Sequence, residues 1–380
     1  MPALYRKYRP RAFRDLVGQS QIKEIFGNAG RQDKLAHAYV FYGSRGTGKT
    51  TVARLVAKLA NCTARDYVHK EGEPCNECAA CAAIDEGRAM DVIEIDAASN
   101  RGIDEIRDLR ESIRVAPSSF IYKVFIIDEA HMLTGPAWNA LLKTLEEPPP
   151  RTIIILATTE YEKIPATIAS RAQRFHFRKI PMRELVAKLN GIVAAEKFVI
   201  TPEAIELIAA ASEGGMRDAQ SLLDQAASTG ASVDLATVES LVGKVGFRRI
   251  AQFADAVAKS DASEALRALH EVRAVGGNVL DVCKELIAYL RRVLALCTDP
   301  KLEELFKDEL TKEELAATIV HSKSIDPVRA IALLKALIAG YGEMRYSPFP
   351  HVPLEVAFIE HLGRSNQGGL PWCVARRYQW

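Results

Sequence analysis

The sequence of 380 residues lacks any uninterrupted apolar stretch near the ~20 residues that a membrane helix needs, so we expect no contact with a membrane. It also lacks a secretory signal, because no apolar run follows the basic cluster at 6–14. The net charge is only +2, so any DNA contact would need a local basic surface. The basic cluster fits a nucleic-acid arm or a solvated or intersubunit face. These absences favour a cytoplasmic globular protein, and the length predicts two or three domains.

Cysteine is scarce and unevenly placed. Four of the seven cysteines, Cys62, Cys75, Cys78 and Cys81, fall within 20 residues, and the others are scattered. A disulfide framework is unusual in a chain of this length without an export signal. Four thiolates suffice for a closed tetrahedral Zn²⁺ site with no position left for a catalytic water. An iron–sulfur cluster, which takes the same ligands, is the second choice, and a redox CxxC pair fits less well.

The first half of the chain alternates apolar strands with helical patterns. We expect strands at 38–42, 92–95, 124–127 and 153–156, and a helix at 51–61 with one apolar face. Near-continuous apolar strands separated by helices predict a parallel sheet that is covered on both faces.

After about residue 179 the pattern is helical and we expect no further strand. Short helices at 181–227 are broken at Thr201-Pro202 and at Gly214-Gly215, and a longer helical region covers 247–362. We expect domains at 1–179, 180–243 and 244–362, with a boundary near 243–246 and a tail at 363–380. Two amphipathic faces are predicted in the last domain: Val279, Val282, Cys283, Leu286, Leu290 and Val293, and then Val328, Ile331, Leu334, Ile338 and Tyr341.

Residues 43–50 match the pattern Gly-x-x-x-x-Gly-Lys-[Ser/Thr] without a deviation, between a predicted strand and a predicted helix. Glycines let the backbone curl so that its N–H groups point at phosphate oxygens, and the helix adds its positive end. Lys49 would reach the β- and γ-phosphates, and Thr50 would ligate Mg²⁺. The predicted nucleotide contacts here are Gly43, Ser44, Arg45, Gly46, Thr47, Gly48, Lys49, Thr50 and Thr51.

An acidic pair follows the predicted strand at 124–127. Asp128 would hold the Mg²⁺ and its water shell, and Glu129 would polarise the attacking water as a general base. Such a pair is common by chance, but together with the phosphate loop it predicts a nucleoside triphosphatase. His131 completes an Asp-Glu-Ala-His run and is interpreted as structural.

At this point the residues resemble a known family, the gamma/tau subunits of bacterial DNA polymerase III, which are the ATPases of the sliding-clamp loader. The matching segments are 43–50, 94–99, 139–149, 156–159 and 170–171, within a likeness that runs from 4 to 243 and more weakly to 362. The run Asn-Ala-Leu-Leu-Lys-Thr-Leu-Glu-Glu-Pro-Pro at 139–149 is far more discriminating than the phosphate loop. The resemblance implies an α/β AAA+ domain with a zinc-binding insertion at 62–81, a small helical lid domain and an all-α collar.

The resemblance also assigns catalytic roles. Thr159 matches the sensor threonine of the family, with Thr158 as a competitor, although threonine also simply favours strands. Arg171 matches the arginine finger, whose guanidinium fork stabilises charge on the ATP of the neighbouring subunit. The family has Ser-Arg-Cys where Ala172 follows here, which removes an apolar side chain and no charge. Arg174 is the alternative finger.

Further contacts with the nucleotide are implied by the same likeness. Residues 214–219 match the lid motif, from which Arg217 would reach the γ-phosphate and couple nucleotide state to the lid. Segments near the N-terminus resemble those that surround the adenine, with Tyr5, Tyr8 and Val17 as the base contacts. The four-cysteine module is given a structural role, with contacts between subunits as an open possibility.

The resulting hypothesis is an ATP-driven clamp loader at the nucleoid. Its expected partners are delta, delta prime and further copies of the chain, the sliding clamp and primer–template DNA, with ATP, Mg²⁺ and Zn²⁺ as cofactors. The intact phosphate loop and acidic pair argue against delta prime, which usually has a degraded loop. Another AAA+ DNA-remodelling motor, of the helicase or branch-migration type, would explain neither the cysteines nor the 139–149 run. A third reading is a scaffold that binds ATP without turnover.

The chain shows no sign of a nucleotidyl-transfer site. The long form of the family has extra domains that tether the polymerase core and the replicative helicase, so these partners are expected only if a longer form exists. The ending at 363–380 fits a frameshifted short form, a gene-model artefact or a real terminus.

Overall fold

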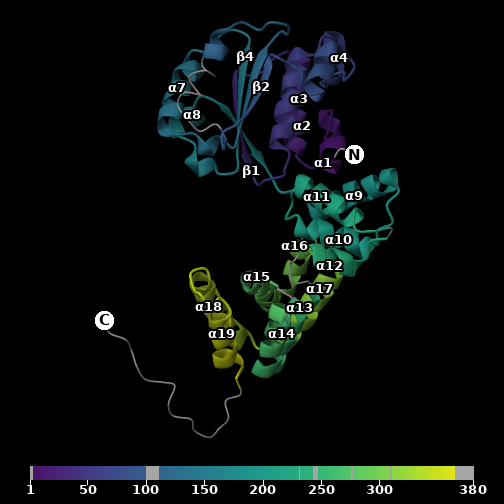
Figure 1. Cartoon of the computed structure of the whole chain (residues 1–380), viewed down its shortest axis with the longest axis vertical. Coiled ribbons are helices and arrows are strands. Elements are labelled where there is room, and N and C mark those ends of the chain that lie inside the picture. The colour runs from purple at the N-terminus through teal and green to yellow at the C-terminus, as the bar shows by residue number, and fades with distance from the viewer. Residues whose placement is uncertain are drawn as a thin grey trace. The chain divides into compact units, whose positions relative to one another are not determined.

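The computed structural model describes residues 3–99, 111–230, 232–242, 247–274, 277–307 and 310–363, and it separates the chain into two compact units between Val233 and Asp234 (Figure 1). The predicted boundary at 243–246 and all of the predicted tail except Gly363 lie outside the described residues. The division into three domains therefore stays a prediction. Within the described ranges no helix combines the length and apolarity that crossing a bilayer requires.

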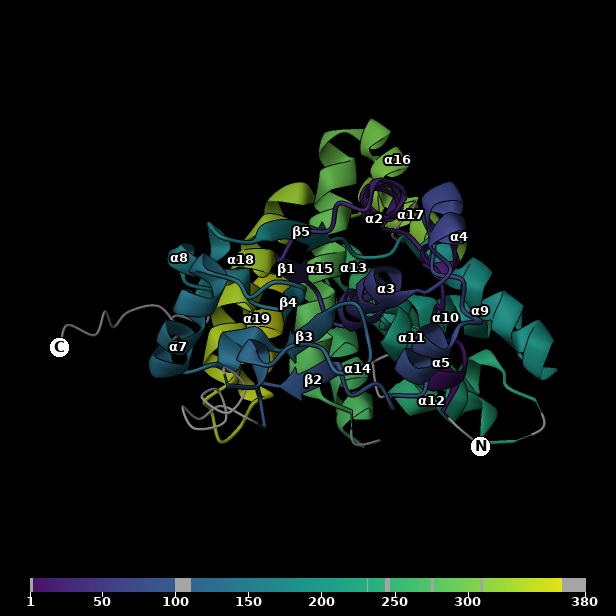
Figure 2. The ribbon, with the colours of Figure 1, turned by 90° about the horizontal axis from the view of Figure 1, so that it is seen from above.

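The first unit is built around a five-stranded parallel sheet in the order β2-β3-β4-β1-β5, which Figure 2 shows from above. Four strands are the predicted ones, and the sheet confirms the predicted fold class. The fifth, an edge strand beside β1, was not predicted; Phe175 and Phe177 in it face inward and alternate with exposed polar residues. The strands are β1 (Ala38–Gly43), β2 (Val92–Asp96), β3 (Lys123–Asp128), β4 (Thr152–Thr158) and β5 (Gln173–Phe177).

Helices cover both faces of the sheet, as the apolar strands require (Figure 1). One face packs against α2 (Ser20–Gln32) and α3 (Lys49–Asn61), and α4 (Arg65–Glu71) and α5 (Ala79–Asp85) join the same core. The other face packs against α7 (Gly135–Glu146) and α8 (Ala166–Ala169). Because the strands are parallel, β1, β3 and β4 all end at one edge of the sheet, and their carboxyl ends carry the predicted site residues.

Three helices follow the sheet in the first unit: α9 (Met182–Glu196), α10 (Pro202–Ala211) and α11 (Met216–Ala227). The predicted breaks are confirmed. Thr201 caps α10 by accepting a hydrogen bond from the Ala204 N–H, and Pro202 occupies its first position. Gly214 has a φ of 90° between α10 and α11. A short helix near the N-terminus, α1 (Leu4–Lys7), packs against α11, where the Leu4 N–H donates to Asp224 at 3.3 Å.

The second unit is helical throughout its described residues. Its core contains the predicted face of α15 except Val279, which is partly buried and packs against that core, and α18 and α19 lie side by side (Figure 1). The elements are α12 (Leu235–Val242), α13 (Phe247–Lys259), α14 (Ala262–Ala274), α15 (Val279–Thr298), α16 (Glu303–Phe306), α17 (Lys312–Ser324), α18 (Pro327–Met344) and α19 (Val352–Leu362).

The predicted face of α18 is not the face that enters this core. Val328, Ile331 and Ile338 are 76%, 46% and 55% exposed, and Leu334 and Tyr341 are half-buried. The helix is apolar around most of its circumference, so its periodicity does not select one side. The buried row is Ala330, Leu333, Leu337, Gly340 and Met344.

Candidate nucleotide site and metal centre

The phosphate loop connects the end of β1 to the start of α3, as predicted. Gly43, Gly46 and Gly48 have φ angles of 143°, 74° and 104°, which residues with a Cβ rarely adopt. A Cβ on Gly43 would lie 2.1 Å from the carbonyl oxygen of Phe177 in the neighbouring strand. Helix α3 begins at Lys49, so the unpaired N–H groups of its first turn and its positive end lie at the loop. This arrangement suits a polyphosphate.

The side chain of Lys49 folds back onto the phosphate loop. Its Nζ donates hydrogen bonds to the carbonyl oxygens of Gly43 and Ser44, both at 2.9 Å, and the residue is 6% exposed. Burial lowers the pKa of Lys49, and the nearby carboxylates of Glu129 and Asp128 oppose that shift. The ammonium is thus a largely desolvated cation beside two carboxylates.

The acidic pair lies beside the start of α3. The Thr50 hydroxyl donates to Asp128 Oδ2 at 2.7 Å, so the two predicted Mg²⁺ ligands are in contact. Asp96, at the end of β2, stands opposite Asp128 in the sheet register. Hydroxyl and carboxylate oxygens are the donors that Mg²⁺ prefers. The residues present therefore fit Mg²⁺ at this edge of the sheet.

The structure distinguishes the two threonines at the end of β4. Thr159 donates to Glu129 Oε2 at 3.1 Å. Thr158 is fully buried, and its hydroxyl contacts His131 Nδ1 at 3.0 Å and accepts from the Glu160 N–H at 3.0 Å. Of the two hydroxyls, that of Thr159, just after the strand, is therefore the one bonded to the Glu129 carboxylate.

Glu129 is held in an unusual conformation. Its φ is 47°, in the left-handed region, and His131 Nδ1 lies 3.4 Å from its Oε2. The second ring nitrogen of His131 lies 3.2 Å from Glu160 Oε1. His131, predicted as structural, therefore links the loop that carries Glu129 to the end of β4.

A cavity of about 400 Å³ extends from the phosphate loop to the N-terminal segment. The predicted base contacts Tyr5, Tyr8 and Val17 line it, as does Arg217. The guanidinium of Arg217 stacks 4.9 Å from the centre of the Tyr5 ring. Four further lining residues belong to the segments 4–10, 16–19 and 214–219, whose likeness to the family implied nucleotide contacts, but were not themselves named: Arg9, Pro10, Leu16 and Met216. Lining residues outside those segments, which sequence reasoning missed, are Glu94, Asp96, Ile180, Lys188 and Gln220.

Two of the residues that were not named had a signal in the sequence. Arg9 belongs both to the basic cluster and to the N-terminal segment that resembles those around the adenine, and burial lowers its pKa. Met216 adjoins the predicted lid residue Arg217, and its N–H donates to the Gly46 carbonyl at 2.9 Å. The first residue of α11 therefore touches the phosphate loop directly.

Arg171 does not line this cavity. Its guanidinium donates to the Thr167 carbonyl at 2.6 Å and lies 2.8 Å from Glu146 Oε1, in the Glu-Glu-Pro-Pro segment. The alternative finger, Arg174, is in β5 and donates to the Tyr161 hydroxyl at 3.3 Å, which raises its pKa. In this position Arg171 is bonded to Thr167 and Glu146 and contributes nothing to the cavity beside its own phosphate loop.

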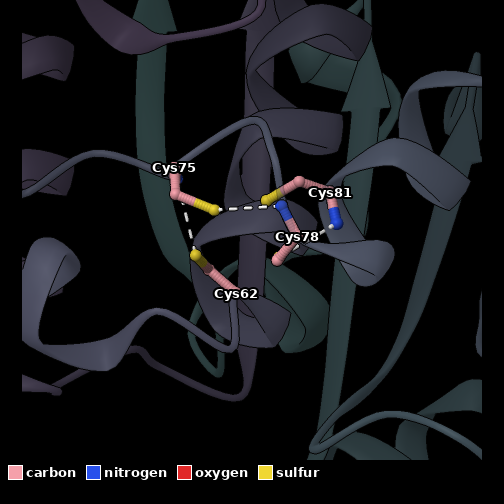
Figure 3. A group of neighbouring side chains, drawn as sticks. All are labelled: Cys62, Cys75, Cys78 and Cys81. Atoms are coloured by element: carbon pink, nitrogen blue, oxygen red, sulfur yellow. Dashed lines mark hydrogen bonds between the residues drawn. The ribbon is translucent and has the colours of Figure 1, made fainter.

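The four predicted cysteine ligands come together (Figure 3). Their Sγ atoms all lie within 4.8 Å of one another, and Cys62 and Cys81 are fully buried. A ZnS₄ tetrahedron with bonds of about 2.3 Å has sulfurs about 3.8 Å apart, so the arrangement fits Zn²⁺. Burial raises the pKa of the Cys62 and Cys81 thiols, which a bound cation would reverse. Burial also opposes ionisation of Cys78, but N–H donors from Cys81 and Thr63 lower the pKa of Cys78 to about 6.

These features together define the nucleotide-binding region of a AAA+ protein. The parallel sheet carries a phosphate loop after β1 and an acidic pair after β3, and the first residue of a following helical lid contacts the loop. Sequence comparison supports this class along the chain. The family described as DNA polymerase III, delta subunit, matches residues 18–181. The clamp-loader ATPase lid domain matches 184–232, and domain III of DNA polymerase III subunits gamma and tau matches 233–366.

Relatives narrow the class to one family. The chain is 45% identical over 372 residues to DNA polymerase III subunit tau of Bacillus subtilis, covering 96% of this chain and 64% of that protein. It is 32% identical to DNA polymerase III subunit gamma of Buchnera aphidicola, covering 94% of this chain and 97% of that protein. This chain belongs to the family of DNA polymerase III gamma/tau subunits.

Some relatives are longer, and structural likeness is distant. The chain covers 64%, 41% and 60% of three of the relatives it matches. Among solved structures, the Bacillus subtilis clamp loader delta protein is similar over 90% of this chain and 99% of that chain, with a TM-score of 0.41 and 12% identity.

Proposed function

We propose that this chain is an ATPase motor subunit of the bacterial replicative clamp loader, which uses ATP binding and hydrolysis to load a sliding clamp onto primed DNA. The observation that carries the proposal is the contact set at the sheet edge: Thr50 with Asp128, and Thr159 with Glu129. A subunit that only binds ATP has no need for an oriented general base. Family membership supplies the biological setting.

The residues suggest how hydrolysis proceeds. N–H groups of the loop and the first turn of α3 bind the phosphates, and Lys49 donates to the β- and γ-phosphate oxygens. Thr50 and Asp128 would hold Mg²⁺, which neutralises phosphate charge when bound. Glu129 accepts a proton from the attacking water, and Thr159 fixes the orientation of the Glu129 carboxylate.

A complete site needs a second subunit. Arg171 is held outward by Glu146 and the Thr167 carbonyl, away from the cavity of its own chain. In an assembly it would reach the ATP of a neighbour, where a guanidinium stabilises charge on the transferring phosphoryl group. Hydrolysis would thereby depend on the arrangement of the ring.

The lid supplies a second coupling. The start of α11 contacts the phosphate loop, and Arg217 extends from the same turn into the cavity. A γ-phosphate that attracts Arg217 would shift α11, so the angle of the lid would follow the nucleotide state. The four cysteines would hold Zn²⁺ as a structural site.

The exposed row of α18 would serve assembly. Val328, Ile331 and Ile338 form an apolar stripe that a solvated monomer does not need. We infer that it packs against delta, delta prime or further copies of the chain in a helical collar. The sliding clamp and primer–template DNA complete the proposed partners; polymerase core and helicase would require a longer form.

The test is phosphate release by the assembled loader with clamp and primed DNA. Glu129→Gln should bind ATP with unchanged affinity but hydrolyse it at least about 10²-fold more slowly, because the general base is lost. Glu162→Gln, an exposed carboxylate nearby, is the control and should behave as the unaltered chain. Unchanged phosphate release by Glu129→Gln would sink the enzyme assignment and leave an ATP-binding scaffold.

A further inference from the structure

The N-terminal segment lines one end of the nucleotide cavity and also meets the cysteine module. Tyr8, Arg9 and Pro10 line the cavity, and so do Leu16 and Val17. The residues between them, 11–15, do not. Contacts that hold residues 11–15 therefore also set the positions of residues 8–10 and 16–17, because so short a stretch cannot move at its centre without moving its ends.

Glu73 holds this stretch by two hydrogen bonds. The backbone N–H of Phe13 donates to Glu73 Oε2 at 2.7 Å, and the N–H of Arg14 donates to Glu73 Oε1 at 2.8 Å. One carboxylate thus receives two adjacent amides, as at a helix N-terminus, and the stretch forms a 3₁₀ turn there. Phe13 is 1% exposed and stacks on Phe26 at 5.7 Å, so the turn is anchored in the core.

Lys58 also holds this stretch, at Arg11. It lies on α3, the helix of the phosphate loop, and is 1% exposed. Its Nζ donates to the Arg11 carbonyl at 3.1 Å, to Asn76 Oδ1 at 2.5 Å and to both oxygens of Asp85 at 2.8 and 2.9 Å. A buried ammonium is stable only with such partners, so its position is strongly determined.

Two of the three acceptor side chains lie within the cysteine module, and the third ends the helix that follows Cys78. Glu73 lies two residues before Cys75, and Asn76 follows Cys75 with a φ of 65°. Asp85 ends α5, which begins after its N-cap, Cys78. A metal that fixes Cys75 and Cys78 therefore also fixes the loop and helix that carry the three acceptors.

We propose that the four-cysteine module positions the base-binding wall of the nucleotide cavity, with Glu73 and Lys58 as the positioning residues that connect it to the N-terminal segment. The inference rests on the proposed ATP site. The metal would then have a functional effect beyond stability: its loss weakens binding of the nucleoside end of ATP. Binding of the phosphates depends on the loop and α3, which do not require Glu73.

The test compares two ligands on the full-length chain. Glu73→Gln keeps one carbonyl oxygen but places an NH₂ group against the second amide donor. Affinity for ATP should fall about tenfold, equivalent to about 1.4 kcal/mol. Affinity for inorganic tripolyphosphate should change less than about twofold. Glu77→Gln, an exposed carboxylate in the same loop, is the matched control and should leave both affinities unchanged.

Zinc content is measured on every sample. It distinguishes a change in the position of the N-terminal segment from loss of the metal by the four-cysteine module. The Glu73 variant should retain one zinc per chain, and extraction of zinc from the unaltered chain should give the same selective loss of ATP affinity, restored when Zn²⁺ is added back. The extraction arm decides alone if the Glu73 variant does not fold. The inference would be overturned if Glu73→Gln bound ATP as tightly as Glu77→Gln does, or if it lost affinity equally for ATP and tripolyphosphate. Either result would still be consistent with the proposed ATP site. No ATP binding by the unaltered chain would instead refute the proposed function.

Discussion

Asp91 offers a sharp test of the packing that supports the acidic pair. It precedes β2 and is 2% exposed, and its carboxylate accepts three backbone N–H groups, from Ser118 at 2.9 Å, Ser119 at 2.7 Å and Phe120 at 2.9 Å. These residues lead into β3, the strand that ends in Asp128. Asp91→Asn removes the charge and one acceptor oxygen while it preserves the shape.

The cost follows from this geometry. Asparagine offers one carbonyl oxygen and turns its NH₂ group toward the remaining donors, so at least one of the three N–H groups loses its partner. An unpaired donor costs about 1–3 kcal/mol when it is buried, and the exposed positions of Ser118 and Ser119 keep the total within that range even though the remaining bonds lose the assistance of charge. We expect a loss of about 1–3 kcal/mol in the free energy of unfolding of the first unit. For a unit of this size the melting temperature would fall by roughly 2–12 °C.

The effect should depend on pH in a defined direction. Burial alone would raise the pKa of Asp91, but the N–H donors of Ser118, Ser119 and Phe120 outweigh it and lower that pKa. The stabilisation is therefore complete above the unfolded pKa of about 3.9 and disappears as pH falls through the depressed folded value. The difference between the unaltered chain and Asp91→Asn should be constant above about pH 5 and shrink in acid.

Calorimetry measures both effects, and the transition of the first unit is identified by its shift with ATP and Mg²⁺. Asp66→Asn, at an exposed position, is the control and should cost less than about 1 kcal/mol. A melting temperature for Asp91→Asn equal to that of the control would refute the reasoning. So would a difference that does not diminish in acid.

Three further predictions follow from the site and the second unit. Thr159→Val should retain ATP affinity and slow phosphate release roughly tenfold, since one hydrogen bond of about 1.4 kcal/mol orients Glu129; an unchanged rate would remove Thr159 from the mechanism. Cys81→Ser should reduce zinc from one per chain to none, measured by elemental analysis; retained zinc would contradict the four-ligand site. Ile338→Glu should weaken self-association in sedimentation velocity without lowering the melting temperature, whereas Leu305→Glu, also exposed, should leave association unchanged; equal behaviour would refute the collar surface.

Local patterns predicted much of the first unit because they report local physics. The phosphate loop requires left-handed glycines between a strand and a helix, and its sequence shows all of these. The close spacing of the four cysteines in the sequence likewise predicted that they form one cluster. Strand β5 was missed because an edge strand with two phenylalanines among polar residues gives only a short alternating signal.

The remaining features depend on contacts distant in sequence. Nothing in the sequence near Lys58 indicates that it bonds to the Arg11 carbonyl and to Asp85. The choice between Thr158 and Thr159 requires knowing which face of β4 meets Glu129. The outward row of α18 could not be distinguished from its buried row, because both are apolar.

The central claim, that each active site is shared between neighbouring subunits, is tested most directly by mixing two inactive variants. Lys49→Ala removes the phosphate-binding lysine but keeps a normal Arg171, and Arg171→Ala removes the finger but keeps a normal loop. Each alone, assembled with clamp and primed DNA, should hydrolyse ATP about 10³-fold more slowly than the unaltered chain. Mixed assemblies should regain phosphate release, because some neighbours then form a complete site. A mixture no more active than its components would contradict the shared site, as would full activity of Arg171→Ala alone.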